Sequence, residues 1–230
     1  MIDLYTAPTP NGFKASIALE ELALPYQVHV VDIRGGAQFK PEFLRISPNN
    51  KIPAIVDQEG PGGKPLSVFE SGAILVYLAE KTGRLLARDG AARYAALEWT
   101  FFQVGGTGPM LGQAAHFRAY APEKIPYAID RYTNEAKRLF GVLDRRLGEA
   151  PYLAGEEYTI ADIANLPWLL GYDRLGIDVA KEYPHLERWM KKLRERTAVQ
   201  KGLATPPRSD APMDEKAREV LFGKTQYEKR

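Results

Sequence analysis

The sequence predicts an α/β domain with a mixed four-stranded sheet, followed by an all-α domain built as a helical bundle. Runs of β-preferring residues fall in the first part of the chain, where they alternate with helical patterns. Beyond residue 85 the strand signal stops, and apolar residues recur at helical spacing instead. We therefore expect a first domain over residues 1–82, a helical domain over residues 90–205 and a tail over residues 206–230.

Four strands are expected in the first domain. They are residues 2–5, 27–31, 54–57 and 66–68. A helix that starts near Pro10, where proline is well tolerated, connects the first two strands and makes them parallel. The loop Gly60–Gly63 joins the last two as an antiparallel hairpin. With a short helix at residues 39–44 and a helix at residues 71–81 that ends at Gly83, the result is a thioredoxin-like arrangement.

The second domain is expected to be helical throughout. The expected helices are residues 91–118, 125–147, 160–175 and 183–196. Thr159–Asp162 forms a capping box, and Tyr158 and Ile163 suit a hydrophobic staple, so these residues indicate a helix start rather than a functional site. The tail is rich in proline and then in charge. We expect it to be loosely ordered, with Val220–Phe222 able to dock on the body.

The composition excludes several classes of site. There is no cysteine, which excludes cysteine nucleophiles and zinc–thiolate sites, so any thiol chemistry must use the thiol of a ligand. His29, His116 and His185 lack metal-ligand spacing, and we expect no metal and no catalytic histidine. The 31 basic and 29 acidic residues are well mixed, which argues against a nucleic-acid surface. No apolar run approaches the ~20 residues of a membrane span, and the start lacks a signal peptide, so we expect a cytoplasmic protein without a membrane partner.

The stretch Ser47–Val56, with Phe69–Gly72 after it, has the features of a binding site for a small acidic peptide. Pro53 lacks an N–H, and a cis bond before it costs little, so the backbone of Ile52 is expected to face an open edge. An extended peptide can pair with such an edge. Ser71 opens a helix and offers a hydroxyl and an N–H to a carboxylate. An ordinary hairpin followed by an N-capped helix explains the same residues, and both interpretations stay open.

Thr9 and Asn11 lie at the start of the first expected helix, where the positive end of the helix dipole would stabilise a thiolate. Lowering the pKa of a thiol by two units requires about 2.7 kcal/mol. One charge-assisted hydrogen bond of about 1.5–3 kcal/mol and a dipole contribution of about 0.3–1 kcal/mol reach that scale. Plain helix capping is the alternative. No phosphate-binding loop, dinucleotide fingerprint or serine nucleophile elbow offers a competing chemistry.

Several motifs together resemble one known family. The more specific ones are Pro8–Gly12, Phe43–Ile55 and Gln103–Gln113, and the general ones are Ile52–Pro53, Glu70–Ser71 and Thr159–Asp162. To about residue 205, the chain resembles the glutathione transferases. Within that family it looks like the nu class, which comprises glutathione-dependent disulfide-bond reductases without a catalytic cysteine.

The resemblance implies that Thr9 and Asn11 are the catalytic residues and face the sulfur atoms. Tyr5 is an alternative thiol donor, because tyrosine-type transferases place their thiol-activating hydroxyl near the end of this strand. The Pro-Thr-Pro-Asn-Gly turn is the nu-like feature and favours Thr9 and Asn11.

The resemblance also implies a set of glutathione-binding residues. The backbone of Ile52, ahead of Pro53, would pair with the cysteinyl unit. Glu70 would take the ammonium group of the γ-glutamyl unit, and Ser71 would take its carboxylate.

Further roles follow from the same resemblance. Gln38 and Lys51 would contact the glycyl side or the backbone of the tripeptide. Arg131 would reach into the site of the neighbouring subunit of a homodimer; without the family, an arginine beside Asp130 indicates a solvated helix face. Gly105–Gly112 would border a site for two glutathione molecules or one disulfide, or would allow tight helix packing at a dimer interface.

The expected protein is a cytoplasmic, homodimeric enzyme in which glutathione, as co-substrate, reduces a small disulfide by thiol–disulfide exchange. Conjugation of glutathione to electrophiles and reduction of organic peroxides are alternatives, because they need the same thiolate. A non-catalytic binding module with the same fold is an alternative of a different class. The expected ligands are glutathione or oxidised glutathione and a small disulfide or electrophile.

Overall fold

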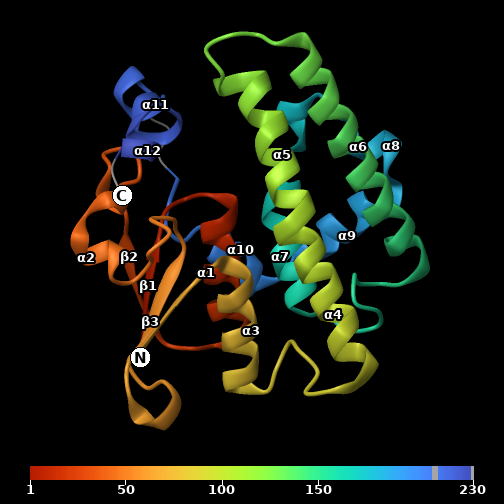
Figure 1. Cartoon of the computed structure of the whole chain (residues 1–230). Helices are drawn as coiled ribbons and strands as arrows, with labels where there is room; N and C mark the ends of the chain where they lie inside the picture. The colour runs from red at the N-terminus through yellow and green to blue at the C-terminus, as the bar shows by residue number, and fades with distance from the viewer. Residues whose placement is uncertain (209–211, 229–230) are drawn as a thin grey trace. The chain divides into compact units, whose positions relative to one another are not determined.

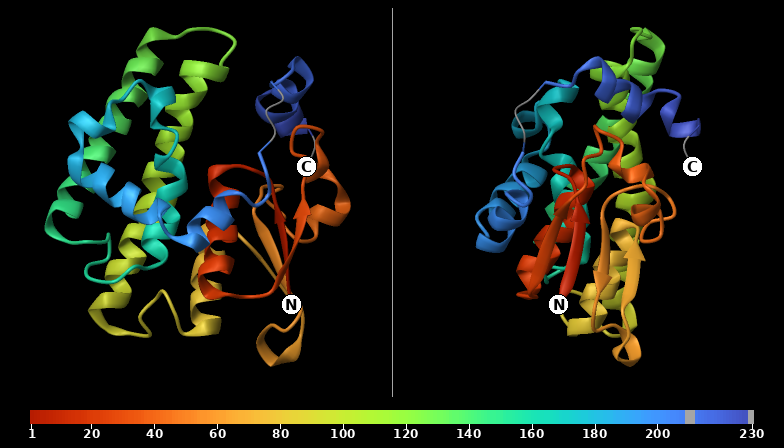
Figure 2. Two further views of the ribbon diagram at one scale, coloured as in Figure 1. Left: turned by 180° about the vertical axis from the view of Figure 1, so that it is seen from behind. Right: turned by 90° about the vertical axis from the view of Figure 1, so that its left-hand side faces the viewer.

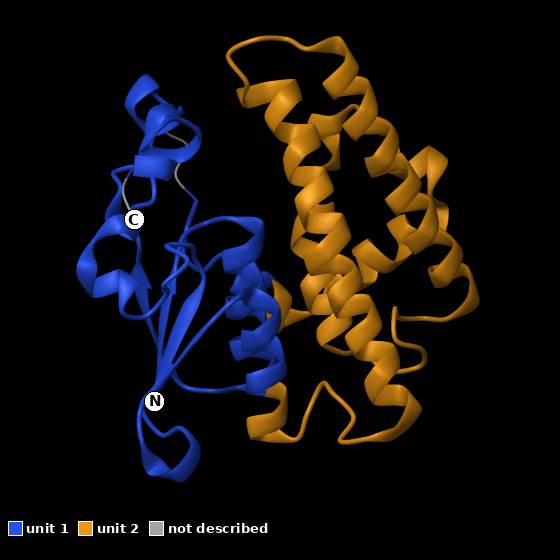
Figure 3. Ribbon diagram, viewed as in Figure 1, with its two compact units in different colours: residues 1–78, 200–230 blue, residues 79–199 orange. Residues whose placement is uncertain are grey.

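The computed structural model describes residues 1–208 and 212–228. The chain divides into two compact units, residues 1–78 with 200–230 and residues 79–199, which Figure 3 shows in different colours. Over the described part of the chain, no helix has the length and apolar character that crossing a membrane requires.

Unit 1 is built on a four-stranded mixed sheet, as predicted. Its strands are β1 (Ile2–Thr6), β2 (Tyr26–Val30), β3 (Ala54–Asp57) and β4 (Leu66–Phe69), in the order β2-β1-β3-β4. β1 runs parallel to β2, and the β1–β3 and β3–β4 pairs are antiparallel. Leu4, Ile55 and Val68 are neighbours across the three strands, and Leu4 and Ile55 are fully buried. Along β1, buried residues alternate with half-buried ones, and this alternation fixes which face of the sheet carries the core.

Helices cover both faces of this sheet. They are α1 (Pro10–Leu22), α2 (Pro41–Leu44) and α3 (Ser71–Thr82), with 3₁₀ turns η1 (Ala37–Phe39) and η2 (Pro61–Gly63). Figure 1 shows α1 and α3 on one face and α2 on the other. α1 is buried on nearly all sides from Gly12 to Leu19, so the side chains of its first turns are shielded from solvent.

The end of the chain folds onto unit 1. α10 (Thr197–Leu203) is followed by α11 (Glu215–Phe222) and α12 (Thr225–Glu228). Ser16 Oγ donates a hydrogen bond of 2.7 Å to the carbonyl of Gly202. The expectation of a loosely ordered tail was wrong for residues 212–228, where Asp214 caps α11 through the N–H of Ala217 and the chain forms two helices. Tail residues 209–211 and 229–230 lie outside the described part.

Unit 2 is helical, as predicted. Its helices are α4 (Gly90–Phe102), α5 (Gly108–Ala115), α6 (Pro126–Glu149), α7 (Ile160–Leu169), α8 (Val179–Glu182) and α9 (Pro184–Arg194), with π segments η3 (Gln103–Thr107) and η4 (His116–Tyr120) and the 3₁₀ turn η5 (Tyr172–Leu175). α5 packs against α6, α4 against α7, and α6 against α9 (Figure 2). On α6 the buried residues recur at helical spacing, as Ala136, Leu139, Phe140, Leu143 and Leu147.

Two predicted helices differ from the structure in detail. The predicted helix over residues 91–118 is continuous but contains two π segments, and the first of them holds Gly105 and Gly106. The predicted end of the third helix at Leu175 was wrong, since α7 ends at Leu169. Pro167 lies inside α7 and removes a backbone donor, and Gly171 follows, so the chain leaves the α conformation and continues as a 3₁₀ turn.

The capping box at the start of α7 is confirmed, and it is tied to the core of unit 2. Thr159 Oγ1 accepts a hydrogen bond from the N–H of Ala161, and Asp162 Oδ2 accepts one of 2.9 Å from the N–H of Thr159. Asp162 Oδ1 also accepts hydrogen bonds from the N–H of Leu153 at 3.1 Å and from Trp189 Nε1 at 2.9 Å. This fully buried carboxylate joins α7, α9 and the loop before α7, which is the structural role expected from the sequence.

Candidate active site

A polar cavity of about 250 Å³ lies within unit 1, where the start of α1, the loop before β3 and the β4–α3 junction meet. Its lining residues are Asn11, Ser47, Asn49, Lys51, Ile52, Pro53, Phe69, Glu70 and Ser71. Six of the residues predicted for the site are therefore brought together here from three separate parts of the chain. Its lining offers amide, ammonium, carboxylate and hydroxyl groups, which suits a small polar ligand with charged ends.

The first side of the cavity is the amino end of α1. Thr9 is the N-cap residue, and its Oγ1 accepts a hydrogen bond of 3.1 Å from the N–H of Gly12. A hydroxyl that accepts one hydrogen bond keeps its own proton for another acceptor, so capping and donation to a ligand are compatible. A Cβ at Gly12 would lie 2.2 Å from the carbonyl oxygen of Ala7, so glycine permits the close approach that sets Thr9 and Asn11 in place.

The second side is the segment that leads into β3. The Ile52–Pro53 peptide bond is cis. Ser47 Oγ donates a hydrogen bond of 2.8 Å to the carbonyl of Lys51 and fixes the loop. The ladder of β3 begins at Ala54, and among the described residues the backbone N–H and C=O of Ile52 form no hydrogen bond. Both groups of Ile52 are thus available to an extended peptide.

The third side is the junction of β4 and α3. Glu70 has a φ of 68°, a left-handed conformation that non-glycine residues seldom adopt, and its carbonyl accepts the hydrogen bond from the N–H of Ile74 that starts the helix. Its carboxylate accepts a hydrogen bond of 3.3 Å from Asn49 Nδ2. Ser71 follows as the first residue of α3, and it is 7% exposed. The amino end of this helix favours an anion.

Lys14 is a residue of this region that the sequence analysis missed. Its side chain is 1% exposed, and its Nζ donates a hydrogen bond of 3.2 Å to Ser71 Oγ. Burial lowers the pKa of Lys14 to about 7, although the negative charge of Glu70 acts in the opposite direction. The sequence gives no signal for this burial. A lysine in a helix normally marks the face toward water, but α1 has no such face around Lys14, because the residues from Gly12 to Leu19 are all buried.

Lys51, on the rim of the cavity, contacts the end of the chain. Its Nζ donates a hydrogen bond of 2.6 Å to Gln226 Oε1, and Gln226 Nε2 donates one to the carbonyl of Val220. α11 and α12 are therefore attached to a residue predicted to hold the glycyl part of a tripeptide.

The remaining predicted residues lie away from the cavity lining. Gln38 is buried, and its Nε2 donates to the carbonyl of Ile33. The ring of Tyr5 is stacked on that of His29 with centroids 4.6 Å apart, and burial raises the pKa of Tyr5. Arg131 is 56% exposed on α6 of unit 2, with Nη1 3.9 Å from the carboxylate of Glu135.

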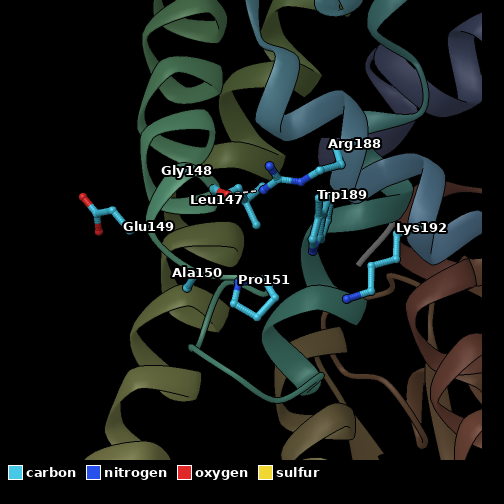
Figure 4. Close-up of a pocket in the computed structure, with 8 residues that line it drawn as sticks. All are labelled: Leu147, Gly148, Glu149, Ala150, Pro151, Arg188, Trp189 and Lys192. Atoms are coloured by element: carbon cyan, nitrogen blue, oxygen red, sulfur yellow. Dashed lines mark hydrogen bonds between the residues drawn. The ribbon is translucent and has the colours of Figure 1, made fainter.

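A second cavity, of about 380 Å³, lies in unit 2 between the end of α6 and α9 (Figure 4). Its polar side chains are engaged in contacts that hold the unit together. Arg188 donates to the carbonyl of Leu147, Trp189 donates to Asp162, and the Nζ of Lys192 lies 4.0 Å from the centroid of the Tyr152 ring. These contacts stabilise the helices and occupy the polar groups that a ligand would need. The polar cavity of unit 1 is therefore the candidate active site.

Known proteins are similar to this chain in sequence and in fold. A model of the glutathione S-transferase N-terminal domain matches residues 9–81, and one of the C-terminal domain matches residues 109–197. The chain is 54% identical over 215 residues to the disulfide-bond oxidoreductase YfcG of Escherichia coli, across 93% of this chain and 100% of that one.

Two solved structures extend the comparison. A glutathione transferase family member from Pseudomonas fluorescens, with two glutathione bound, is 49% identical, with a TM-score of 0.83 over 88% of this chain and 92% of that one. A glutathione transferase from Pseudomonas putida, with one glutathione disulfide bound per subunit, is 48% identical, with a TM-score of 0.84 over 89% of this chain and 91% of that one.

Proposed function

The chain belongs to the glutathione S-transferase family, and we propose that it is a nu-class-like, glutathione-dependent disulfide-bond reductase. The observation that carries this proposal is the polar cavity of unit 1, where a helix amino end, the open backbone of Ile52 and a second helix amino end converge. The chain has no cysteine, so the reacting thiol comes from glutathione. The relative from E. coli, named a disulfide-bond oxidoreductase, supports the same reaction class.

The geometry of the cavity suits each part of the tripeptide. Ser71 Oγ and the amino end of α3 suit the γ-glutamyl carboxylate, and the Glu70 carboxylate suits the ammonium group beside it. The N–H and C=O of Ile52 suit the backbone of the cysteinyl unit, which would add to the edge of the segment before β3. Lys51, on the rim, suits the glycyl carboxylate. The cysteinyl sulfur then faces Thr9 and Asn11.

The reaction follows from that placement. The dipole of α1, the Thr9 hydroxyl and the Asn11 amide stabilise the glutathione thiolate. The thiolate attacks one sulfur of a disulfide, whose S–S bond breaks, and the departing thiolate takes a proton from water. A second glutathione thiolate attacks the resulting mixed disulfide, and glutathione disulfide leaves together with the reduced second product. The relatives solved with two glutathione molecules, or with one glutathione disulfide, support a site of this capacity.

A homodimer is part of this proposal. Tyr94 and Phe101, seven residues apart on one face of α4, are each 66% exposed, and Tyr127 at the start of α6 is 79% exposed. Large apolar side chains left exposed in this way are typical of an interface. Arg131 lies four residues after Tyr127 on the same helix and suits the role of an arginine that reaches a partner's site. The cytoplasm is the proposed location, because it supplies reduced glutathione.

The proposed activity can be ranked against its alternatives with three substrates. We expect glutathione-dependent reduction of 2-hydroxyethyl disulfide to be faster than conjugation of 1-chloro-2,4-dinitrobenzene and faster than reduction of cumene hydroperoxide. Initial rates at matched glutathione concentration measure the order. If conjugation or peroxide reduction is the fastest, that reaction and not disulfide reduction is the main activity. If the protein binds no glutathione at all, a non-catalytic module is favoured.

Ser71→Ala should weaken glutathione binding by about 1–3 kcal/mol, which is roughly a 5- to 150-fold rise in Kd. The reason is that a carboxylate loses a charge-assisted donor in a buried position. Isothermal titration calorimetry measures the change. Ser67→Ala, an exposed serine in β4 outside the cavity, is the matched control and should bind glutathione as the wild type does. An unchanged Kd for Ser71→Ala would remove Ser71 from the site.

A further inference from the structure

Lys14 has an unusual position for a lysine. It is 1% exposed, on a helix whose first turns are buried, and its Nζ is 3.2 Å from Ser71 Oγ. A buried ammonium group is costly unless it has partners, because the charge is removed from water. Lys14 follows Asn11 by three residues, so both side chains project from the same face of α1. One helix therefore directs one group toward the proposed position of the sulfur and another toward the proposed position of the γ-glutamyl carboxylate.

The direction of the hydrogen bond between Lys14 and Ser71 determines what Ser71 offers to a ligand. An ammonium group has donors and no acceptor, so Lys14 uses a lone pair of the Ser71 oxygen. The hydroxyl proton of Ser71 is then available to the cavity that Ser71 lines. We infer that Lys14 is a positioning residue of the proposed glutathione site, which holds Ser71 as a hydrogen-bond donor and places a positive charge behind the ligand's carboxylate.

Loss of the proton from Lys14 would reverse this arrangement. A neutral amine has a lone pair that accepts the Ser71 proton, and Ser71 would then turn its own lone pairs toward the carboxylate. From another element, the carboxylate of Glu70 at the β4–α3 junction acts on Lys14 electrostatically and favours its charged form.

The sign of the resulting pH dependence follows from linkage. A carboxylate bound beside Ser71 adds a negative charge, which favours the charged form of Lys14 and raises its pKa from about 7 in the free site. Binding therefore takes up a proton when the pH is above the free-site pKa. The affinity for the ligand is highest below that pKa and falls as the pH rises through it, toward the raised pKa of the complex.

The test uses S-methylglutathione, because methylation removes the titration of the thiol. Its affinity is measured by calorimetry from about pH 6 to about pH 8, in two buffers that differ in ionisation enthalpy. Over this range the ammonium group of the ligand stays charged, because the carboxylate beside it raises its pKa above that of an ordinary α-amino group. For the wild type we expect about tenfold weaker binding at the upper pH, with net proton uptake near neutral pH. The two buffers report that uptake directly, and structural damage alone does not produce it.

Variants separate positioning from packing. Lys14→Met keeps an unbranched side chain of similar length, and it should bind about tenfold more weakly at pH 6 and lose both the pH slope and the proton uptake. Lys14→Arg keeps the charge at every pH tested, so it should retain binding without the slope. Lys64→Met, an exposed lysine in the β3–β4 hairpin, is the matched control and should reproduce the wild-type profile.

This inference rests on the proposed function, and the outcomes distinguish the two. A wild type that binds S-methylglutathione without proton uptake overturns the role of Lys14 and leaves the glutathione site intact, and so does a Lys14→Met variant with the wild-type pH slope. A wild type that binds no S-methylglutathione at any pH overturns the proposed function and this inference with it. Should Lys14→Met fail to fold, the proton uptake of the wild type and the profile of Lys14→Arg decide the matter.

Discussion

Asn11→Ala should lower the kcat for disulfide reduction by about 10²-fold, while the free energy of unfolding stays within about 0.5 kcal/mol of the wild-type value. Asn11 is the second residue of α1 and lines the cavity, whereas Thr9 supplies the cap of the helix. Alanine suits the first turn of a helix, so the fold loses little. The developing charge on sulfur loses a donor at the helix amino end, where hydrogen bonds to an anion are strongest.

We also expect the pH dependence of kcat to change in Asn11→Ala. With less stabilisation of the thiolate, the pKa of bound glutathione rises, so the acid limb of kcat against pH should move to higher pH. Asn49→Ala is the matched control, because Asn49 is also an amide at the cavity but contacts Glu70. It should raise KM for glutathione and leave the acid limb in place. An Asn11→Ala enzyme with wild-type kcat would remove Asn11 from the thiol-activating role and leave Thr9 or the alternative donor Tyr5, which Tyr5→Phe then separates.

Asp162→Ala should destabilise the protein by about 3–5 kcal/mol, the largest effect on folding that we expect from one substitution. Its carboxylate accepts hydrogen bonds from the N–H groups of Leu153 and Thr159, from the Thr159 hydroxyl and from Trp189 Nε1. Alanine would leave these donors in the core of unit 2 without an acceptor. The cost is then the desolvation of each donor, which exceeds the net value of the hydrogen bonds.

Urea denaturation of Asp162→Ala, followed by circular dichroism and tryptophan fluorescence, measures this loss. Asp178→Ala provides the matched control, because Asp178 also caps a helix through a backbone N–H but lies at the surface. We expect it to cost about 1 kcal/mol or less. Equal costs for the two aspartates would mean that the network around Asp162 contributes no more than an exposed cap.

The strands and the long helices were predictable because their sequences contain local signals. β3 was predicted residue for residue, since the apolar run Ala54–Val56 follows a proline and precedes Asp57 and a glycine loop. α6 repeats apolar residues at helical spacing over 24 residues. The start of α7 was predicted because its capping box is formed by residues three apart in the chain.

The features that were missed depend on packing between distant segments. Short helices such as α8, α11 and α12 have too few turns for a periodic pattern. The π segments differ from an α-helix by a shift of one residue in hydrogen bonding, and the glycines of Gln103–Thr107 signal only a weak helix. Lys14 was missed because a lysine within a helix usually faces water, and its contact with Ser71 joins residues 57 positions apart.

The candidate site was partly predictable for the same reasons. Its backbone elements, the cap at Thr9 and the helix start at Ser71, have sequence signatures, and the structure brings both to unit 1. The contact of Lys51 with Gln226 joins residues 175 positions apart, and it is therefore a property of the folded chain alone.

Because Glu70 has a left-handed backbone conformation, substitutions at this position that raise thermal stability are expected to lower the affinity for the ligand. Glycine and asparagine adopt that conformation with little strain, so a screen for thermal tolerance alone is expected to favour them at this position. Each would replace the carboxylate proposed to hold the γ-glutamyl ammonium group. Engineering this enzyme for industrial durability would therefore need to keep residue 70 fixed and seek its gains elsewhere in the chain.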